Sequence, residues 1–212
     1  MMRRRNHLLG RAVGPGVTAI AIASLALGCA GVGGRDSSAV VKRTPDGFAI
    51  TESVRPRLGL RGQFDDAQEA LSEGEVDRSI ELLEVITGSD PDFAASHINL
   101  AIAYREAGRY EEAVTTLETA IAKSPQHPVA HNELGIAYRR LGRFEEARGA
   151  YLEALDLQPR FHYARKNLAI LCDLFLADLP CALENYAAYH EAVPDDAEVG
   201  IWIADLESRR AE

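Results

Sequence analysis

Histidine and cysteine are the residue types in this sequence best able to bind a metal ion or to act as nucleophiles. His127 and His131 lie four residues apart, a spacing that puts two side chains on one face of a helix, where they could bind zinc. However, Pro128 stands between them, and no glutamate follows in the H-E-x-x-H order of a catalytic zinc helix. We therefore expect no metal site at this pair.

Other catalytic arrangements are not apparent. The sequence contains no Ser/His/Asp order, no glycine-rich phosphate loop and no paired-carboxylate motif that stands out. We therefore expect a protein that is not an enzyme, with no catalytic residues, no cofactor and no small-molecule substrate.

Two of the three cysteines, Cys172 and Cys181, straddle a predicted turn between two helices. The facing helix ends could bring their α-carbons within the roughly 4.4–6.8 Å that a disulfide tolerates. Such a bond persists in exported proteins. The alternative is that both are small buried residues of a helical core. A redox role is disfavoured because the C-x-x-C order is absent.

The N-terminus has the layout of an export signal. Arginines at positions 3, 4, 5 and 11 precede an apolar stretch over residues 17–27, and small residues follow. A transmembrane anchor is the alternative, but the apolar run is about half of the roughly 20 residues needed to span a bilayer. We therefore predict a signal peptide over residues 1–28.

The third cysteine follows that signal directly, in the sequence LALGC at residues 25–29. This sequence resembles the lipobox of bacterial lipoproteins, although Ala26 stands where that family usually has leucine. The resemblance implies a lipid anchor on Cys29 and an outer-membrane protein facing the periplasm. The alternative is ordinary cleavage after Ala30, which would give a soluble periplasmic protein. Residues 29–59 lack a sustained period and are predicted to form a flexible tether, with GFAI at residues 47–50 as a short docking segment.

Composition favours a helical domain beyond the tether. Of the 212 residues, 47 % are hydrophobic but only 7 % are aromatic, a balance that suits helices packed on helices. The formal net charge is −9, and the four leader arginines make the remainder still more acidic. Nucleic acid is therefore an unsuitable partner, because its binding needs a clustered basic surface.

An internal repeat is the strongest pattern in the chain. The stretch that begins at His97 aligns with the stretch that begins at His131, and the match includes Leu100 with Leu134 and Tyr104 with Tyr138. Glycines and prolines keep the same spacing, as expected where each first helix turns and each second helix stops. His97 and His131 occupy equivalent positions and are therefore predicted to be packing residues.

Both copies resemble the tetratricopeptide repeat (TPR), which implies an all-α solenoid of antiparallel helix pairs. Weaker copies extend the pattern on both sides, and the last one has a one-residue insertion. The predicted organisation is a degenerate capping repeat at 60–93, repeats at 94–127, 128–161 and 162–196, and a C-terminal cap helix at 197–212.

The TPR resemblance also implies a groove, lined by the first helices, that binds a protein or peptide segment. Carried over by alignment, its lining residues are Ile98, Ile102, Arg105, Asn132, Ile136, Arg139, Arg140, Tyr163, Lys166, Asn167 and Ile170. An apolar floor with a basic rim suits an extended segment with hydrophobic anchors and some acids. The alternative is that the isoleucines only pack against neighbouring helices.

The layout is similar to that of TPR lipoproteins that support pilus or secretin assembly. This resemblance implies a membrane-tethered periplasmic scaffold that assists assembly or stability of an envelope complex, with protein or peptide segments of that machinery as partners. The alternatives are an adaptor that regulates envelope hydrolases or proteases, and a purely structural spacer.

Overall fold

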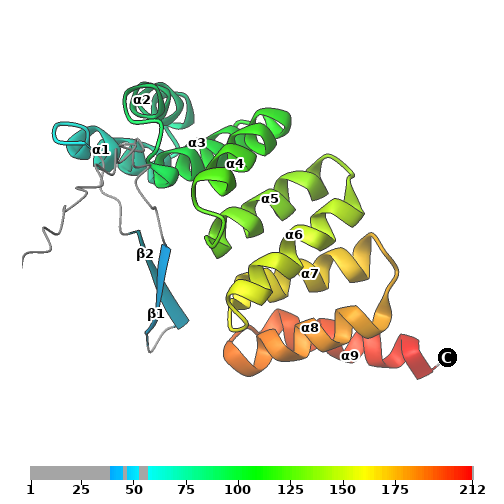
Figure 1. Ribbon diagram of the computed structural model, residues 1–212. Helices are drawn as coiled ribbons and strands as arrows, with labels where there is room; N and C mark the ends of the chain where they lie inside the picture. Colours follow the sequence, from blue (N-terminus) through cyan, green and yellow to red (C-terminus); the bar gives the residue numbers. More distant parts are fainter. Residues whose placement is uncertain (1–38, 45–46, 53–56, 212) are drawn as a thin grey trace, which may run out of the picture. The chain divides into compact units, whose positions relative to one another are not determined.

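The computed structural model describes residues 39–44, 47–52 and 57–211 of the chain. Strand β1 (Ala39–Thr44) pairs antiparallel with strand β2 (Gly47–Glu52), so that Ala39 lies opposite Glu52 (Figure 1). These strands were not predicted from the sequence, and they fall inside the range 29–59 that was predicted to be a flexible tether. The P-D-G order between them favours a turn, and Val, Ile, Phe and Thr favour strands.

The predicted signal peptide and Cys29 lie outside the described residues. Among the residues that are described, no helix is both long enough and apolar enough to cross a membrane.

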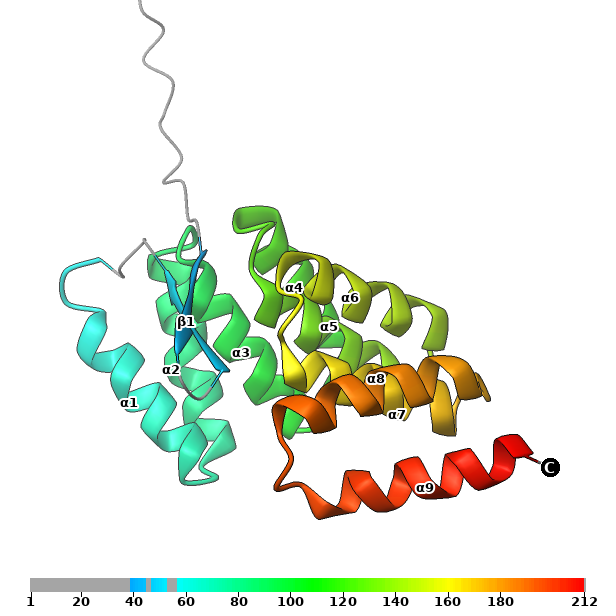
Figure 2. The same cartoon turned by 90° about the horizontal axis from the view of Figure 1, so that it is seen from below.

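From residue 61 onwards the described chain forms four antiparallel helix pairs and one single helix (Figures 1 and 2). The first helices of the pairs are α1 (Arg61–Ser72), α3 (Ala94–Glu106), α5 (Pro128–Arg140) and α7 (His162–Leu174). The second helices are α2 (Val76–Ser89), α4 (Tyr110–Lys123), α6 (Phe144–Leu157) and α8 (Leu179–Ala192), and the single helix is α9 (Ala197–Ala211). The predicted all-α solenoid with a C-terminal cap helix is confirmed.

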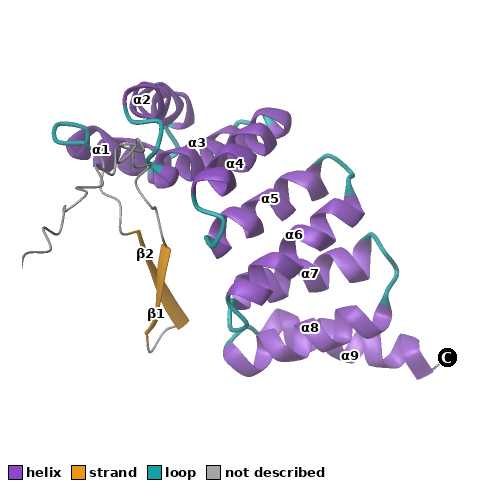
Figure 3. Cartoon of the chain, in the orientation of Figure 1, coloured by secondary structure: helices purple, strands orange, loops and turns teal. Residues whose placement is uncertain are grey.

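The packing follows the order of the chain. Each helix packs against the next one, and the first helices α1, α3, α5 and α7 also contact one another in sequence (Figure 3). One continuous hydrophobic core runs from Ala67 in α1 to Leu206 in α9. Each pair therefore covers the apolar face of its neighbour, as expected for a repeat that cannot bury its own core.

Glycines end the first helices of the two best-matching repeats. Gly108 and Gly142 have φ angles of +77° and +76°, which L-residues with a side chain rarely adopt. The next N–H, from Arg109 or Arg143, donates to the carbonyl of Tyr104 or Tyr138 at 2.8 and 2.9 Å. This is the pattern of a Schellman turn, in which orphan carbonyls at the helix end are satisfied. The last repeat lacks the glycine, and Ala177 takes a positive φ of 52° instead.

A repeated polar contact joins each first helix to the end of the preceding repeat. Nε2 of His97 lies 2.9 Å from the carbonyl oxygen of Pro91, and Nε2 of His131 lies 2.9 Å from that of Pro125. In the last repeat Arg165 occupies the same position, and its Nη2 donates to the carbonyl of Pro159 at 3.4 Å. These two histidines therefore have a structural role at the repeat junctions.

A Tyr–Arg–Glu clasp joins the two helices within each of the two central repeats. In one repeat the guanidinium of Arg109 lies 4.3 Å from the ring centroid of Tyr104 and 2.7 Å from the carboxylate of Glu112. In the next repeat Arg143 contacts Tyr138 and Glu146 in the same way. Each tyrosine hydroxyl also donates to a glutamate of the preceding repeat, Glu84 at 2.7 Å or Glu118 at 3.1 Å. The clasp thus fixes the turn after each first helix.

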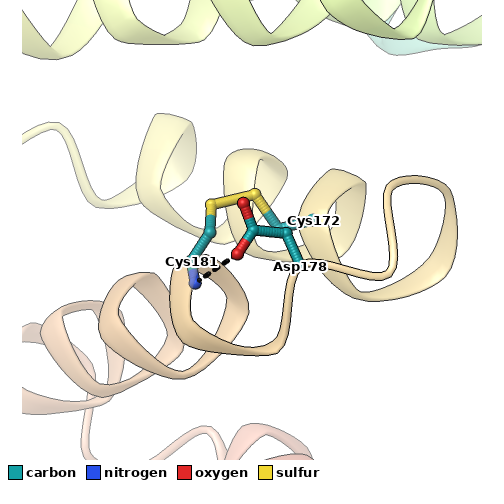
Figure 4. A group of neighbouring side chains, drawn as sticks. All are labelled: Cys172, Asp178 and Cys181. Atoms are coloured by element: carbon teal, nitrogen blue, oxygen red, sulfur yellow. Dashed lines mark hydrogen bonds between the residues drawn. A yellow bond between two sulfur atoms is a disulfide. The ribbon is translucent and has the colours of Figure 1, made fainter.

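A disulfide between Cys172 and Cys181 replaces this clasp in the last repeat (Figure 4). Cys172 stands at the position of the clasp tyrosine, and Cys181 is the third residue of its helix, as Glu112 and Glu146 are of theirs. Asp178 stands in place of the arginine, and its Oδ1 accepts the Cys181 N–H at 3.1 Å. In the described chain these three residues are the one group spaced to hold a metal ion, but sulfurs joined to each other are not thiolate ligands.

A buried histidine precedes α5. His127 is only 6 % exposed, and Phe93 and Phe161 occupy the equivalent buried positions of the preceding and following repeats. Burial, and to a smaller extent the positive charge of the nearby His131, lower the pKa of His127 to about 4. The unfolded state, with a pKa near 6.5, therefore binds a proton more readily than the folded state does.

We expect the stability that depends on neutral His127 to be present above pH 6.5 and lost as the pH falls towards 4. The loss from this residue alone should be about 3 kcal/mol. His127→Phe, which copies the two equivalent phenylalanines, should remove it. Urea unfolding at pH 7 and pH 4.5 measures this, because other acid-sensitive groups affect wild type and variant alike. If the stability difference between the two proteins were the same at both pH values, the role of His127 would be disproved.

Candidate protein-binding surface

The first helices α3, α5 and α7 lie side by side and form one surface of the solenoid, which we call the first-helix face. Ile102, Ile136 and Ile170 occupy equivalent positions on these helices, one in each of three successive repeats, and each is only partly buried. We call these three residues the isoleucine row. Apolar side chains at the same position of three successive repeats, still reached by solvent, can contact the apolar side chains of a bound polypeptide.

The remaining predicted groove residues differ widely in their exposure. Ile98 and Asn132 are each only 4 % exposed, because they are enclosed between neighbouring helices. They therefore act in packing and hydrogen bonding rather than as surface that a ligand can reach. By contrast, Tyr163 is 61 % exposed and Arg140 is also exposed. The other predicted residues, Arg105, Arg139, Lys166 and Asn167, are half-buried.

A chain of hydrogen bonds crosses the first-helix face and occupies several of these polar groups. The amide of Asn167 donates to Oδ1 of Asn132 at 3.0 Å, and the amide of Asn132 donates to Oε1 of Glu133 at 3.3 Å. Nε of Arg105 donates to the other oxygen of Glu133 at 3.0 Å, and Arg105 also pairs with Glu106 at 2.8 Å. Three first helices are thereby linked, and Arg105 already has two carboxylate partners.

Glu133 is the residue of this network that the sequence analysis missed. Burial raises the pKa of its carboxyl group, while the positive charge and hydrogen bond of Arg105 oppose that shift. The repeat alignment did contain a signal, because Glu133 is an acid at a position where the adjacent repeats have Asn99 and Asn167. An acid at a position where the other repeats have an amide indicates a charged partner that is specific to that repeat, here Arg105.

Lys166 is also occupied, by residues that attach the cap helix. Its ammonium lies 2.7 Å from Oδ2 of Asp196 and 5.1 and 5.4 Å from the ring centroids of Tyr189 and Trp202. The hydroxyl of Tyr189 donates to the same Asp196 oxygen at 2.9 Å. These contacts join α7, α8 and α9, so Lys166 holds the cap helix in place rather than offering a free charge to a ligand.

Arg139 and Arg140, in the last turn of α5, differ from the other basic residues of this face. Within the described part of the chain, neither guanidinium has an ion pair with a carboxylate. The Arg139 guanidinium interacts with the buried Tyr151 hydroxyl, whereas its Nε, which is also buried, has no acceptor. Burial raises the pKa of Tyr151 to about 12 even though the positive charge and hydrogen bond of Arg139 oppose the shift. The face thus combines the isoleucine row with two arginines that have no carboxylate partner, which we call the unpaired arginines.

Comparison with known proteins agrees with this architecture. The tetratricopeptide repeat family model matches residues 61–128, 98–160 and 132–173, which together cover more than half of the chain. No protein among those with curated descriptions matches the sequence.

Several solved structures share the fold at low sequence identity. TTC0263, a TPR protein of Thermus thermophilus, is 24 % identical, with 70 % of this chain and 81 % of that chain covered and a TM-score of 0.61. PilF of Pseudomonas aeruginosa is 21 % identical, with coverages of 72 % and 69 % and a TM-score of 0.65. The first TPR of Spaghetti (RPAP3), bound to the HSP90 peptide SRMEEVD, is 21 % identical, with coverages of 58 % and 97 % and a TM-score of 0.54.

These likenesses describe the fold, and the repeat signature, the helix pairs and the family match agree with one another. The chain belongs to the tetratricopeptide repeat family.

Proposed function

We propose that this protein is a scaffold that binds segments of other proteins through its first-helix face. The observation that supports this most strongly is the isoleucine row, which packs on the core but is still partly reached by solvent, beside two arginines that lack an ion pair. Tetratricopeptide repeats form interaction scaffolds, and the structure related to this one in Spaghetti (RPAP3) holds a peptide. In this proposal the protein acts by binding alone, without catalytic chemistry, a cofactor or a small-molecule substrate.

The proposal places the scaffold in the bacterial cell envelope. The basic and apolar leader and the LALGC sequence support export and a lipid anchor on Cys29, facing the periplasm from the outer membrane. The partners would be protein or peptide segments of a pilus, secretion or transport complex whose assembly or stability the scaffold assists. The similarity in fold to PilF of Pseudomonas aeruginosa agrees with this proposal.

Affinity capture from the native envelope tests the scaffold role with two matched variants. Ile136→Asp puts a charge on the first-helix face, whereas Leu152→Asp makes the same kind of change at an exposed leucine of α6, a second helix. Thermal melting first confirms that both variants keep the fold. We expect wild type and Leu152→Asp to retain pilus or secretion components that Ile136→Asp loses.

The identity of the captured proteins separates the alternatives. Envelope hydrolases or proteases with the same dependence on Ile136 would favour the adaptor role over the assembly role. Equal recovery by all three proteins would contradict binding through the first-helix face and leave a structural spacer.

The lipid anchor has its own prediction. Cys29→Ser removes the only side chain at the predicted cleavage site whose thiol could be alkylated, so the variant should remain unprocessed or leave the membrane fraction. Gel mobility, fractionation and mass analysis of the N-terminus measure this. Cys181→Ser serves as the control for loss of a cysteine elsewhere. Unchanged signal cleavage and membrane association in Cys29→Ser would rule out the anchor and favour cleavage after Ala30.

A further inference from the structure

The repeat alignment shows why Arg139 of α5 lacks an ion pair. Arg105, Arg139 and Asp173 occupy the same position of α3, α5 and α7, the first helices of three successive repeats. Arg105 pairs with Glu133 of α5, the next first helix. Asp173 pairs with Arg209 of α9, and its Oδ1 lies 3.1 Å from Nη1 of that arginine. Only the middle residue of the three lacks an ion pair within the described chain.

The missing partner can be traced to one substitution between repeats. One repeat after Glu133, the equivalent residue of α7 is Asn167, which has no charge and donates its amide to Asn132. The next acid along, Asp173, is already bound by Arg209. Arg139 therefore has a buried Nε–H with no acceptor, and buried donors in native proteins normally have one. Neighbouring Arg140 adds a second, exposed positive charge.

We propose that Arg139, assisted by Arg140, binds the carboxylate of a glutamate or aspartate within a partner segment whose apolar side chains contact the isoleucine row. This inference rests on the proposed scaffold function and specifies its ligand. A guanidinium offers paired N–H donors that match the two oxygens of a carboxylate, so the partner supplies the acid that the α7 helix lacks.

The surroundings favour an acidic side chain within a polypeptide over other anions. Glu133 and Asp173 lie on α5 itself and on the adjacent first helix α7, and their negative charges would repel a doubly charged phosphate more strongly than a single carboxylate. Ile102 on α3 and Ile170 on α7, the two neighbouring first helices, flank α5 on both sides. A segment that crosses these helices thus contacts apolar surface on both sides of Arg139. A chain that ended at the arginine would cover the apolar surface on one side only.

A defined peptide tests this proposal with the full-length protein in detergent micelles. The probe is a fluorescent 12-residue peptide, acetylated and amidated, with one glutamate between two leucines on each side, and its partner has glutamine in place of the glutamate. Because a charge-assisted hydrogen bond is worth about 1.5–3 kcal/mol, wild type should bind the glutamate peptide at least about tenfold more tightly.

Matched variants assign the preference to the arginine. Arg139→Gln should lose most of the preference for the glutamate peptide, because only Arg140 remains to attract the carboxylate. Reversing the charge at both positions, as Arg139→Glu with Arg140→Glu, should weaken the glutamate peptide further and leave the melting temperature nearly unchanged. Arg160→Gln, at an exposed arginine between α6 and α7, should keep the full preference.

Other results would overturn the proposal. These are equal binding of both peptides by wild type, a preference of unchanged size in Arg139→Gln, or no binding of either peptide. Tighter binding of a glutamine peptide with a free C-terminal carboxylate would assign the site to chain ends instead. The proposed scaffold function fails separately, when envelope capture shows no dependence on Ile136.

Discussion

Replacing Gly135 by alanine is expected to lower the free energy of unfolding by about 2 kcal/mol, although alanine favours a helix more than glycine does. A Cβ atom at this position would lie only 2.5 and 2.6 Å from Cε1 and Cδ1 of the Tyr151 ring. Tyr151 is 0 % exposed, so its ring is enclosed by the core and has no free space into which to move. The close packing of α5 against α6 therefore depends on the absence of a Cβ atom at residue 135.

The neighbouring repeat supplies a compensating change. There the equivalent residues are Ala101 and Leu117, both buried in the same core. Tyr151→Leu alone should destabilise because it leaves a cavity, whereas Gly135→Ala with Tyr151→Leu should cost less than the two single changes added together. In the last pair Ala169 stands with Tyr186, and the ring of Tyr186 packs against Trp202 of α9 with centroids 5.5 Å apart.

Chemical denaturation of the four proteins in this cycle gives the coupling directly. We expect the double variant to recover at least half of the loss caused by Gly135→Ala. Additive losses would show that the ring and the glycine are not in conflict, and the close approach of α5 and α6 would then need another cause.

Loss of the Cys172–Cys181 disulfide is the second large effect that we expect. The bond joins residues nine apart in sequence with α-carbons 5.9 Å apart. Loop-closure entropy for a loop of this size predicts a loss of about 2–3 kcal/mol on reduction. The bond joins α7 to α8, and α9 is attached to α7 through the ion pair between Lys166 and Asp196. The last three helices should therefore be the part of the protein that loosens on reduction.

The central repeats provide the comparison for this bond. Arg143→Ala breaks the equivalent noncovalent clasp, which is exposed, and should destabilise the protein much less than loss of the disulfide does. Thermal melting with and without a thiol reductant measures the effect of the disulfide. Cys172→Ala with Cys181→Ala should match reduced wild type and should not respond to the reductant. Equal melting of oxidised and reduced wild type would show that the disulfide does not stabilise the last repeat.

Much of the helical architecture could be predicted because it repeats locally. Glycine at 108 and 142 and proline at 125 and 159 mark the ends of helices by backbone geometry alone, which requires no knowledge of distant contacts. The hairpin at 39–52 was missed because two six-residue strands have too short a pattern to stand out in a segment rich in glycine, serine and charge.

The surface was harder to predict because its polar groups are paired over long distances in sequence. Lys166 looks like a free basic residue until Asp196, thirty residues later, is placed beside it. Arg105 likewise meets Glu133 from the next repeat, 28 residues away. Ile98 and Asn132 align with surface positions of the family, but in this chain the neighbouring helices enclose them. Only the pairing of the folded chain distinguishes occupied residues from the unpaired arginines.

Site-specific photocrosslinking in living cells tests the binding role of the first-helix face most directly. A photoreactive amino acid at Ile170 on α7 should give a covalent adduct with a partner protein. The same residue at Thr119, exposed on the second helix α4, should give none. Adducts from Thr119 with none from Ile170 would contradict the account, because partners would then bind the second helices instead.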